Sequence, residues 1–419
     1  MITAVSSSTL PTASASEARA PLVERAAYVS LLAFAAAPQF SIAAANVLLG
    51  LTALLWLVLV VTHRERIEVP RMFWPLLAYA GGTLVASLYS VIPEISFLDC
   101  KQLLLFAIVP ISYRLLRGER SLTAVDVVIT VGALNAVYGI VQYGIMDFDN
   151  IQKRIQGNLG HYMTYSGVIM LVACVAVARV MFRRRDRMWA ALILPAVLVA
   201  LVLTLSRNAW VGACAGIGAL VLLKDTKHAL RFAAILPIAL GVFVAFAPKT
   251  VTDRFYSSIA LNRIVGGSAT ANSTVQSNKD RIAMAVAGFR IIKDHPLTGV
   301  GPDMVIEVYP GYRPASAVSQ SVSHLHNVPL QIAAERGLPV LAIWIWFVWM
   351  LLRDFLQKRK TSAVPSIATA GIACVVAMLA AGMFEYNFGD SEFLMLFLVL
   401  ITLPYAADRP LAPASRRAV

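Results

Sequence analysis

The chain has 419 residues, of which 58% are hydrophobic and only 14% charged, and its mean hydropathy is +0.71. Soluble domains carry roughly 25% charged residues, so this composition excludes an ordinary soluble globule, a disordered chain and a disulfide scaffold. The formal charge of +13 does not indicate a nucleic-acid partner here, because the Lys and Arg residues gather in loops between long apolar segments. The cysteines lie within apolar runs and are expected to be free thiols: Cys100, Cys174, Cys214 and Cys374.

The apolar segments predict an all-α, polytopic membrane protein. Residues 1–24, rich in Ser, Thr and Ala, are expected to form a disordered cytoplasmic tail. The later apolar segments are long enough to cross a hydrocarbon core of roughly 30 Å as helices. We predict about twelve transmembrane helices, nine within 25–247 and three within 327–407: 25–40, 42–61, 72–90, 95–115, 122–145, 162–181, 188–205, 207–223, 230–247, 327–352, 364–384 and 390–407.

The loop charges predict the orientation of these helices. Lys and Arg in short loops stay on the cytoplasmic side, and most of them lie in loops on the side of the N-terminus. Both termini, including the tail 408–419, are therefore expected to be cytoplasmic. The segment 248–326 then forms one large loop on the opposite face. A loop of this length is usually functional or disordered.

Within this large loop the pattern predicts one amphipathic helix over 280–294. Its apolar residues Ile282, Val286 and Phe289 recur at three-to-four spacing, and His295-Pro296 ends it. Residues 266–277 are expected to be flexible. Residues 299–302, Gly-Val-Gly-Pro, are interpreted as a turn that returns the chain toward the membrane.

Three side chains are candidates for chemistry on that outer face. Arg207 follows a tight turn at the start of a helix, where its guanidinium and the free helix N–H groups suit a phosphate; an interfacial Arg beside Trp210 is the other interpretation. Arg281 stands in the first turn of the loop helix, where the residues alone favour a solvated surface charge. His326 can act as a general base near neutral pH, but it could also pair with His324 on a metal or cap a helix.

Four stretches of the chain match the pattern of a known family: HNVPLQIAAERGLP at 326–339, LSRNAWVG at 205–212, DRIAMAVAGFRIIKDHPLTGVGPD at 280–303 and GNLGHYMTYSG at 157–167. They resemble the superfamily of O-antigen ligases and Wzy polymerases, membrane glycosyltransferases of the GT-C type. Val340 departs from the residue types of the ligase pattern.

The resemblance implies an O-antigen ligase of the bacterial inner membrane with a periplasmic active site. Such an enzyme joins O-antigen polysaccharide from undecaprenyl diphosphate to lipid A-core, and membrane lipids surround it. His326 maps onto the proposed base, and Arg207 and Arg281 map onto the groups that hold the diphosphate. We expect inversion at the anomeric carbon, no cofactor and no metal, since the outer-face acids show no paired or Asp-x-Asp spacing. Weaker candidates for lining the site are Lys153, Arg154, His161, Tyr165, His324 and Asn327.

Other functions remain open at this stage. A Wzy-type polymerase would use the same donor with a growing glycan as acceptor. An O-linked protein glycosyltransferase usually carries an extra C-terminal region. A secondary transporter or flippase would need charged groups near the bilayer midplane and broken helices in corresponding halves. The sequence does not specify the sugars or the oligomeric state, nor which helices admit the lipid.

Overall fold

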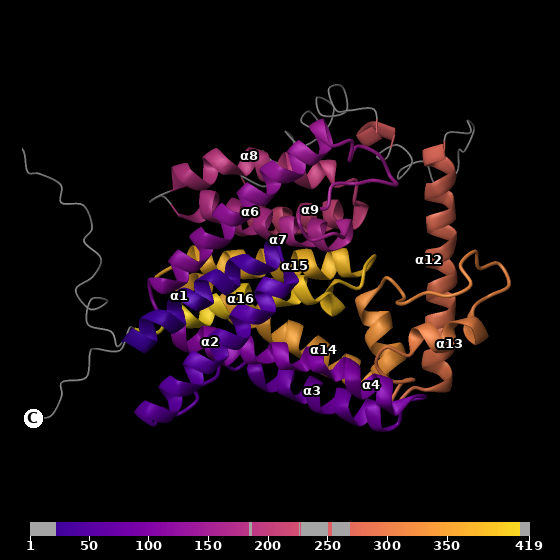
Figure 1. Cartoon of the computed structure of the whole chain (residues 1–419), viewed down its shortest axis with the longest axis horizontal. Helices are drawn as coiled ribbons and strands as arrows, with labels where there is room; N and C mark the ends of the chain where they lie inside the picture. Colours follow the sequence, from indigo (N-terminus) through magenta and orange to yellow (C-terminus); the bar gives the residue numbers. More distant parts are fainter. Residues whose placement is uncertain (1–21, 184–186, 226, 228–249, 254–268, 411–419) are drawn as a thin grey trace, which may run out of the picture.

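A computed structural model describes residues 22–183, 187–225, 227, 250–253 and 269–410. Apart from one isolated bridge between Asp149 and Arg154, these residues form helices and connecting loops. Most helices run side by side in a bundle, and one helix, α12, stands across the ends of the others (Figure 1). The predicted all-helical class is confirmed for the described part of the chain.

The helices follow the apolar segments closely. Each predicted span coincides with a helix or helical run, except 230–247, which lies outside the described residues. The 3-10 segments η2 (Ala37–Gln39), η3 (Cys100–Ala107) and η4 (Asn387–Gly389) connect helices. The α-helices are α1 (Leu22–Ala36), α2 (Ile42–His63), α3 (Phe73–Leu88), α4 (Pro93–Asp99), α5 (Ile108–Leu115), α6 (Arg120–Ile145), α7 (Tyr162–Phe182), α8 (Arg187–Leu203), α9 (Arg207–Lys224), α12 (Ala269–Asp294), α13 (Val305–Tyr312), α14 (Val328–Thr361), α15 (Pro365–Gly382) and α16 (Ser391–Ala406).

Several helices of the described residues have the length and composition of membrane spans. Helix α1 begins at Leu22, so the last residues of the predicted tail are helical. The count of twelve spans and the orientation of the chain stay predictions. Six helical segments of the described chain are long and apolar enough to cross a membrane: Ile42–His63, Pro93–Leu115, Arg120–Ile145, Tyr162–Phe182, Val328–Thr361 and Pro365–Gly382.

Close packing of α9 on α15 brings the start of one helix to the end of the other. A Cβ atom at Gly212 would lie 2.9 Å from the carbonyl oxygen of Ala377, and one at Gly216 would lie 2.8 Å from that of Ala373. Small residues allow such backbone approach between membrane helices. Because the contacts run in opposite directions along the two helices, α9 and α15 are antiparallel. The residues before α9 therefore meet those after α15.

The loop before α13 is fastened to a kink in α14. Gly337 has φ 82° and ψ 168°, which breaks the helix there. The backbone N–H groups of Val300 and Gly301 donate to the carbonyls of Ala334 and Glu335 at 3.0 and 2.9 Å. The predicted turn at 299–302 thus lies directly on α14, and the kink lets these α14 carbonyls accept hydrogen bonds from the loop.

Helix α12 differs from the prediction in two respects. It begins at Ala269 rather than Asp280, so the helix also includes residues 269–277, which were expected to precede it. Its packed face is also different, because Ile282 and Phe289 are 66% and 67% exposed. The buried face consists of small or slender side chains that approach α13 and α14 closely: Ala283, Met284, Ala287, Gly288 and Ile291.

Candidate active site

His326 lies at a strained turn immediately before α14. Its φ of 51° is in the left-handed region, which a non-glycine residue adopts at a cost. The next residue, Asn327, caps the helix, and its side-chain oxygen accepts from the N–H of Leu330 at 2.9 Å. The cap and the packed loop hold the imidazole in one place. Strain of this kind is concentrated at functional sites.

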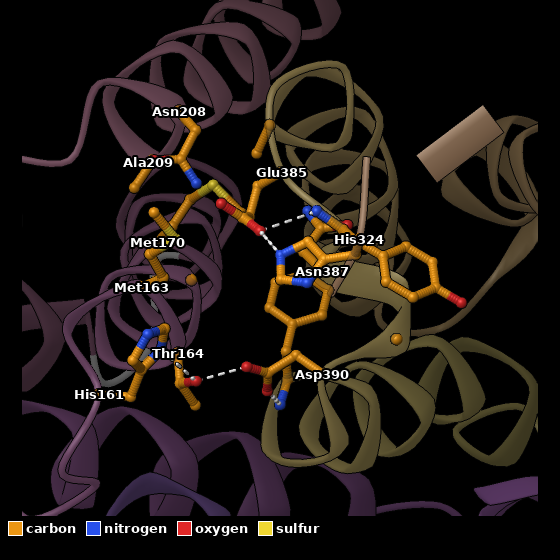
Figure 2. A pocket seen from close by; sticks show the side chains of 15 residues that line it. His161, Met163, Thr164, Met170, Asn208, Ala209, His324, Glu385, Asn387 and Asp390 are labelled. Carbon is orange, nitrogen blue, oxygen red and sulfur yellow. Dashed lines mark hydrogen bonds and ion pairs between the residues drawn. The ribbon is translucent and has the colours of Figure 1, made fainter. Parts of the chain in front are cut away.

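Glu385, in the turn after α15, accepts hydrogen bonds from two imidazoles. Nδ1 of His326 lies 3.0 and 2.9 Å from its two carboxylate oxygens, and Nε2 of His324 lies 3.1 Å from Oε1. Figure 2 shows the contact of His324 with Glu385 at the edge of a cavity. Burial alone raises the pKa of Glu385, but the hydrogen bonds from His324 and His326 outweigh burial and hold that pKa well below its usual range.

The ionised Glu385 determines which nitrogen of a neutral His326 carries the proton. A carboxylate only accepts, so Nδ1 must hold the hydrogen. Nε2 then keeps a lone pair, and it makes no hydrogen bond within the described part of the chain. A carboxylate, an imidazole and a free ring nitrogen in this order are the arrangement of an oriented general base.

Arg207 and Arg281 converge on the same region from different helices. Leu205, with φ 54°, turns the chain into α9, and Arg207 is the first residue of that helix. Its Nη2 donates to Oδ1 of Asn278 in α12 at 3.1 Å. Nη1 of Arg281, one turn further along α12, donates to the carbonyl oxygen of Phe384.

Three arginines of this region lie near one another, and one of them lies near Glu385. Arg281 and Arg154 are close enough to repel the charge of Arg207. Burial lowers the pKa of Arg281, while the negative charge of Glu385 raises it. Basic groups gathered beside a helix N-terminus, where free N–H groups point outward, favour an anion such as a phosphate.

Two cavities meet at His324. The smaller has a volume of about 160 Å³ and is lined by polar groups of α7, α9 and the turn after α15 (Figure 2), including His161, Thr164, Asn208, His324, Glu385 and Asp390. The larger, of about 570 Å³, lies under α12 and includes Asp280, Arg281, Ser319, Ser323, His324 and His326. The shared His324 and Met163 make the two cavities neighbours, which suits a reaction between two substrates.

Lys153 and Arg154 lie in the loop between α6 and α7 and contact different residues. Nζ of Lys153 donates to the carbonyl of Met146 at 3.0 Å and stands over the ring of Phe148. The Arg154 guanidinium stacks over the ring of Tyr162, 4.2 Å from its centroid. Of these two candidates, Arg154 is the one whose charge reaches Arg207.

The remaining candidates divide between cavity and core. His161 lines the smaller cavity, and its Nδ1 is 3.4 Å from Oγ1 of Thr164. Tyr165 is fully buried and donates to the carbonyl of Asn135, so its position is that of a packing residue. Asn327 caps α14 and donates from Nδ2 to the carbonyl of Met383 at 3.1 Å. It joins the start of α14 to the end of α15.

The sequence pattern did not identify Glu385 as a site residue. Glu385 was one acid among several on the expected outer face, and it is 59 positions from His326. With Glu385 included, the ligand atoms of His324, His326 and Glu385 lie within 4.8 Å of one another. Two imidazoles and a carboxylate are donors that a divalent ion such as Zn²⁺ accepts. In the sequence, His324 and His326 alone had no third residue nearby that could complete a metal site.

The site therefore belongs to a polytopic helical membrane protein with an oriented histidine beside two arginines. Residues 192–345 match the family model described as O-antigen ligase. The matched residues include Arg207, Arg281 and His326, and the match supports the resemblance drawn from the sequence. Glu385 lies beyond the matched residues. No curated protein matches the chain.

Proposed function

We propose that this protein is an O-antigen ligase. It transfers O-antigen polysaccharide from undecaprenyl diphosphate to a sugar hydroxyl of lipid A-core, on the periplasmic face of the bacterial inner membrane. The observation that carries the proposal is the contact of Glu385 with Nδ1 of His326, beside the carbonyl that Arg281 binds. Support for the substrate class comes from the family match over residues 192–345.

His326 is the general base of the proposed reaction. The acceptor hydroxyl gives its proton to Nε2 as its oxygen attacks the anomeric carbon of the donor sugar. Nδ1 keeps its own proton in the hydrogen bond to Glu385. The imidazolium that forms is stabilised by the carboxylate, and the same carboxylate fixes the ring orientation.

Arg207 and Arg281 hold the leaving group. The bond between the anomeric carbon and the diphosphate oxygen breaks, and its electron pair goes to the diphosphate. Because the acceptor oxygen enters from the opposite face, the configuration is inverted. Two guanidiniums in a partly buried site stabilise the charge that develops on the diphosphate, as electrostatic stabilisation of a leaving group requires. The diphosphate of the donor is thus the activated leaving group that drives the transfer.

We propose that the reaction needs no metal or other cofactor. The positive charge beside the diphosphate comes from arginines, and Glu385 is engaged as the hydrogen-bond partner of both histidines. A divalent ion on His324, His326 and Glu385 would instead take the nitrogen atoms that donate to the carboxylate. A chelator distinguishes the two cases: it should leave the activity of a metal-free site unchanged and remove the activity of a site that needs the ion.

Reconstitution tests this function. Purified protein in liposomes is mixed with O-antigen on undecaprenyl diphosphate and with lipid A-core, and the products are separated on a gel. Formation of ladder-bearing lipopolysaccharide by the wild type supports the ligase. Lengthening of the donor glycan without lipid A-core would instead show a polymerase, and transport of lipid without either product would contradict both.

A further inference from the structure

Helix α15 exposes one narrow apolar stripe. From Ser366 to Gly382 its residues are buried, apart from Val376, Leu379 and Ala380, and Met383 follows directly after the helix. Leu379 and Ala380 lie three and four positions after Val376, and Met383 lies three positions after Ala380, so these positions share one face. The other residues of α15 from Ser366 to Gly382 are enclosed by neighbouring helices. Molecules outside the bundle can therefore contact this part of α15 at the stripe.

The stripe forms one wall of an apolar groove between α14 and α15. The groove has a volume of about 320 Å³, and its opposite wall is made by Val328, Pro329 and Trp344 of α14. Both helices have the length and hydropathy of membrane spans. The groove therefore opens between two spanning helices and is lined by side chains suited to hydrocarbon.

The groove ends at the candidate active site. Met383, directly after α15, is the last residue of this wall, and the next carbonyl, that of Phe384, accepts from Arg281. Glu385 comes directly afterwards. On α14, Val328 lies two positions after His326. Three consecutive residues thus have three different roles. Met383 lines the apolar groove, the carbonyl of Phe384 accepts from Arg281, and Glu385 accepts from His326.

We propose that this groove binds the first isoprene units of the polyprenyl chain of the donor, with the diphosphate at Arg281 and Arg207. This inference rests on the proposed function and assigns the lipid entrance to α14 and α15. Met383 lines the apolar groove, and Arg281 binds the carbonyl of the next residue, Phe384. A ligand that fills both places must therefore join its hydrocarbon chain directly to its charged group. Polyprenyl diphosphate joins its chain directly to phosphate, whereas a phospholipid inserts a glycerol ester. Met378 and Met383 supply flexible side chains that adapt to branched methyl groups.

Filling the groove tests the proposal. Leu379→Trp and Ala380→Trp add bulk to the stripe, and Leu134→Trp adds it to an exposed position of α6 that is 66% accessible. Transfer rates are measured with the undecaprenyl donor and with a short donor whose diphosphate carries a single methyl group in place of the polyprenyl chain. We expect kcat/KM for the long donor to fall by about tenfold or more in the groove variants, because apolar contact area is lost. Rates with the short donor, and both rates of Leu134→Trp, should stay near wild type. Unchanged rates with the long donor would overturn the proposal.

A second measurement needs neither turnover nor mutation. Wild-type protein in liposomes is irradiated with a polyprenyl diphosphate that carries a diazirine on its second isoprene unit, and the labelled peptides are identified. Labels on Val328–Trp344 and Val376–Met383, removed by unlabelled polyprenyl diphosphate but not by phosphatidylglycerol, support the groove. Labels elsewhere, or labels that phosphatidylglycerol removes equally well, would overturn it. Labelling of the groove by a protein that transfers no glycan would sink the proposed function alone.

Discussion

Nδ1 of His326 lies 3.0 and 2.9 Å from the two carboxylate oxygens of Glu385. The two residues come from the turns that flank α14 and α15, and Asn327 ties those turns together through the carbonyl of Met383. The contact defines the protonated nitrogen of the ring and leaves the other nitrogen for an acceptor hydroxyl. The chemistry of the site depends on this pair.

Removing the charge of Glu385 should slow the reaction without preventing substrate binding. Glu385→Gln retains the shape of the side chain but cannot stabilise an imidazolium. We expect kcat to fall by about 10²-fold or more, with little change in KM for the donor, because general-base catalysis contributes effects of this size. Steady-state kinetics check this. Glu307→Gln, at an exposed position of α13, should behave as wild type.

The two arginines should act through the geometry of the guanidinium as well as through charge. Arg207→Lys and Arg281→Lys keep a positive charge but lose the planar fork that matches phosphate. We expect each to lower kcat/KM for the donor by about tenfold, and the alanine variants by about 10²-fold or more. Arg290→Ala, further along α12, is the control. Lysine variants with full activity would argue against a direct diphosphate contact.

Chelation should leave the reaction intact. With the arginines supplying positive charge, rates measured in EDTA are expected to equal those in untreated protein. The grouping of His324, His326 and Glu385 makes the result informative, since these atoms could also hold a divalent ion. Activity lost in EDTA and restored by Zn²⁺, Mn²⁺ or Mg²⁺ would refute the metal-free mechanism.

The low pKa of Glu385 predicts how acid affects stability. A carboxylate whose pKa is lower in the folded than in the unfolded protein stabilises the fold above the unfolded value, about 4.3 for Glu, and this stabilisation is lost as pH falls further. The difference in melting temperature between wild type and Glu385→Gln should therefore shrink below about pH 4. Thermal melts in detergent measure it. A difference that widens over that acid range would be inconsistent with the lowered pKa.

Gly337 should be difficult to replace. Its φ of 82° disfavours other residues, and a Cβ atom would lie 2.1 Å from the carbonyl oxygen of Leu297. We expect Gly337→Ala to destabilise the protein by about 1–3 kcal/mol, because strained backbone positions cost this much. Gly218→Ala, in α9 with open space around it, is the matched control. Equal melting temperatures for the two variants would contradict this account of the kink.

The sequence predicted those features that depend on local composition. Long apolar runs are sufficient to predict spanning helices, so the helices of the described residues lie where the hydropathy places them. Arg207, Arg281 and His326 were identified by their places beside helix ends and by the family resemblance. The structure shows that Asn278 and Phe384 are the partners of the two arginines.

Features that depend on packing were not predictable in the same way. Glu385 reaches His326 only because α15 packs beside α14, and no spacing in the chain indicates that contact. For α12, the larger apolar residues Ile282 and Phe289 suggested a buried face, yet smaller residues such as Ala287 pack inward. Close helix packing favours small side chains, and a pattern of hydrophobicity does not distinguish the two faces.

A double-mutant cycle tests the central claim, that His326 and Glu385 act as one unit. Transfer of O-antigen to lipid A-core is measured for wild type, His326→Ala, Glu385→Gln and the double variant. If Glu385 acts through His326, the double variant should be no slower than His326→Ala alone. Losses that multiply in the double variant, or wild-type turnover by His326→Ala, would contradict the account.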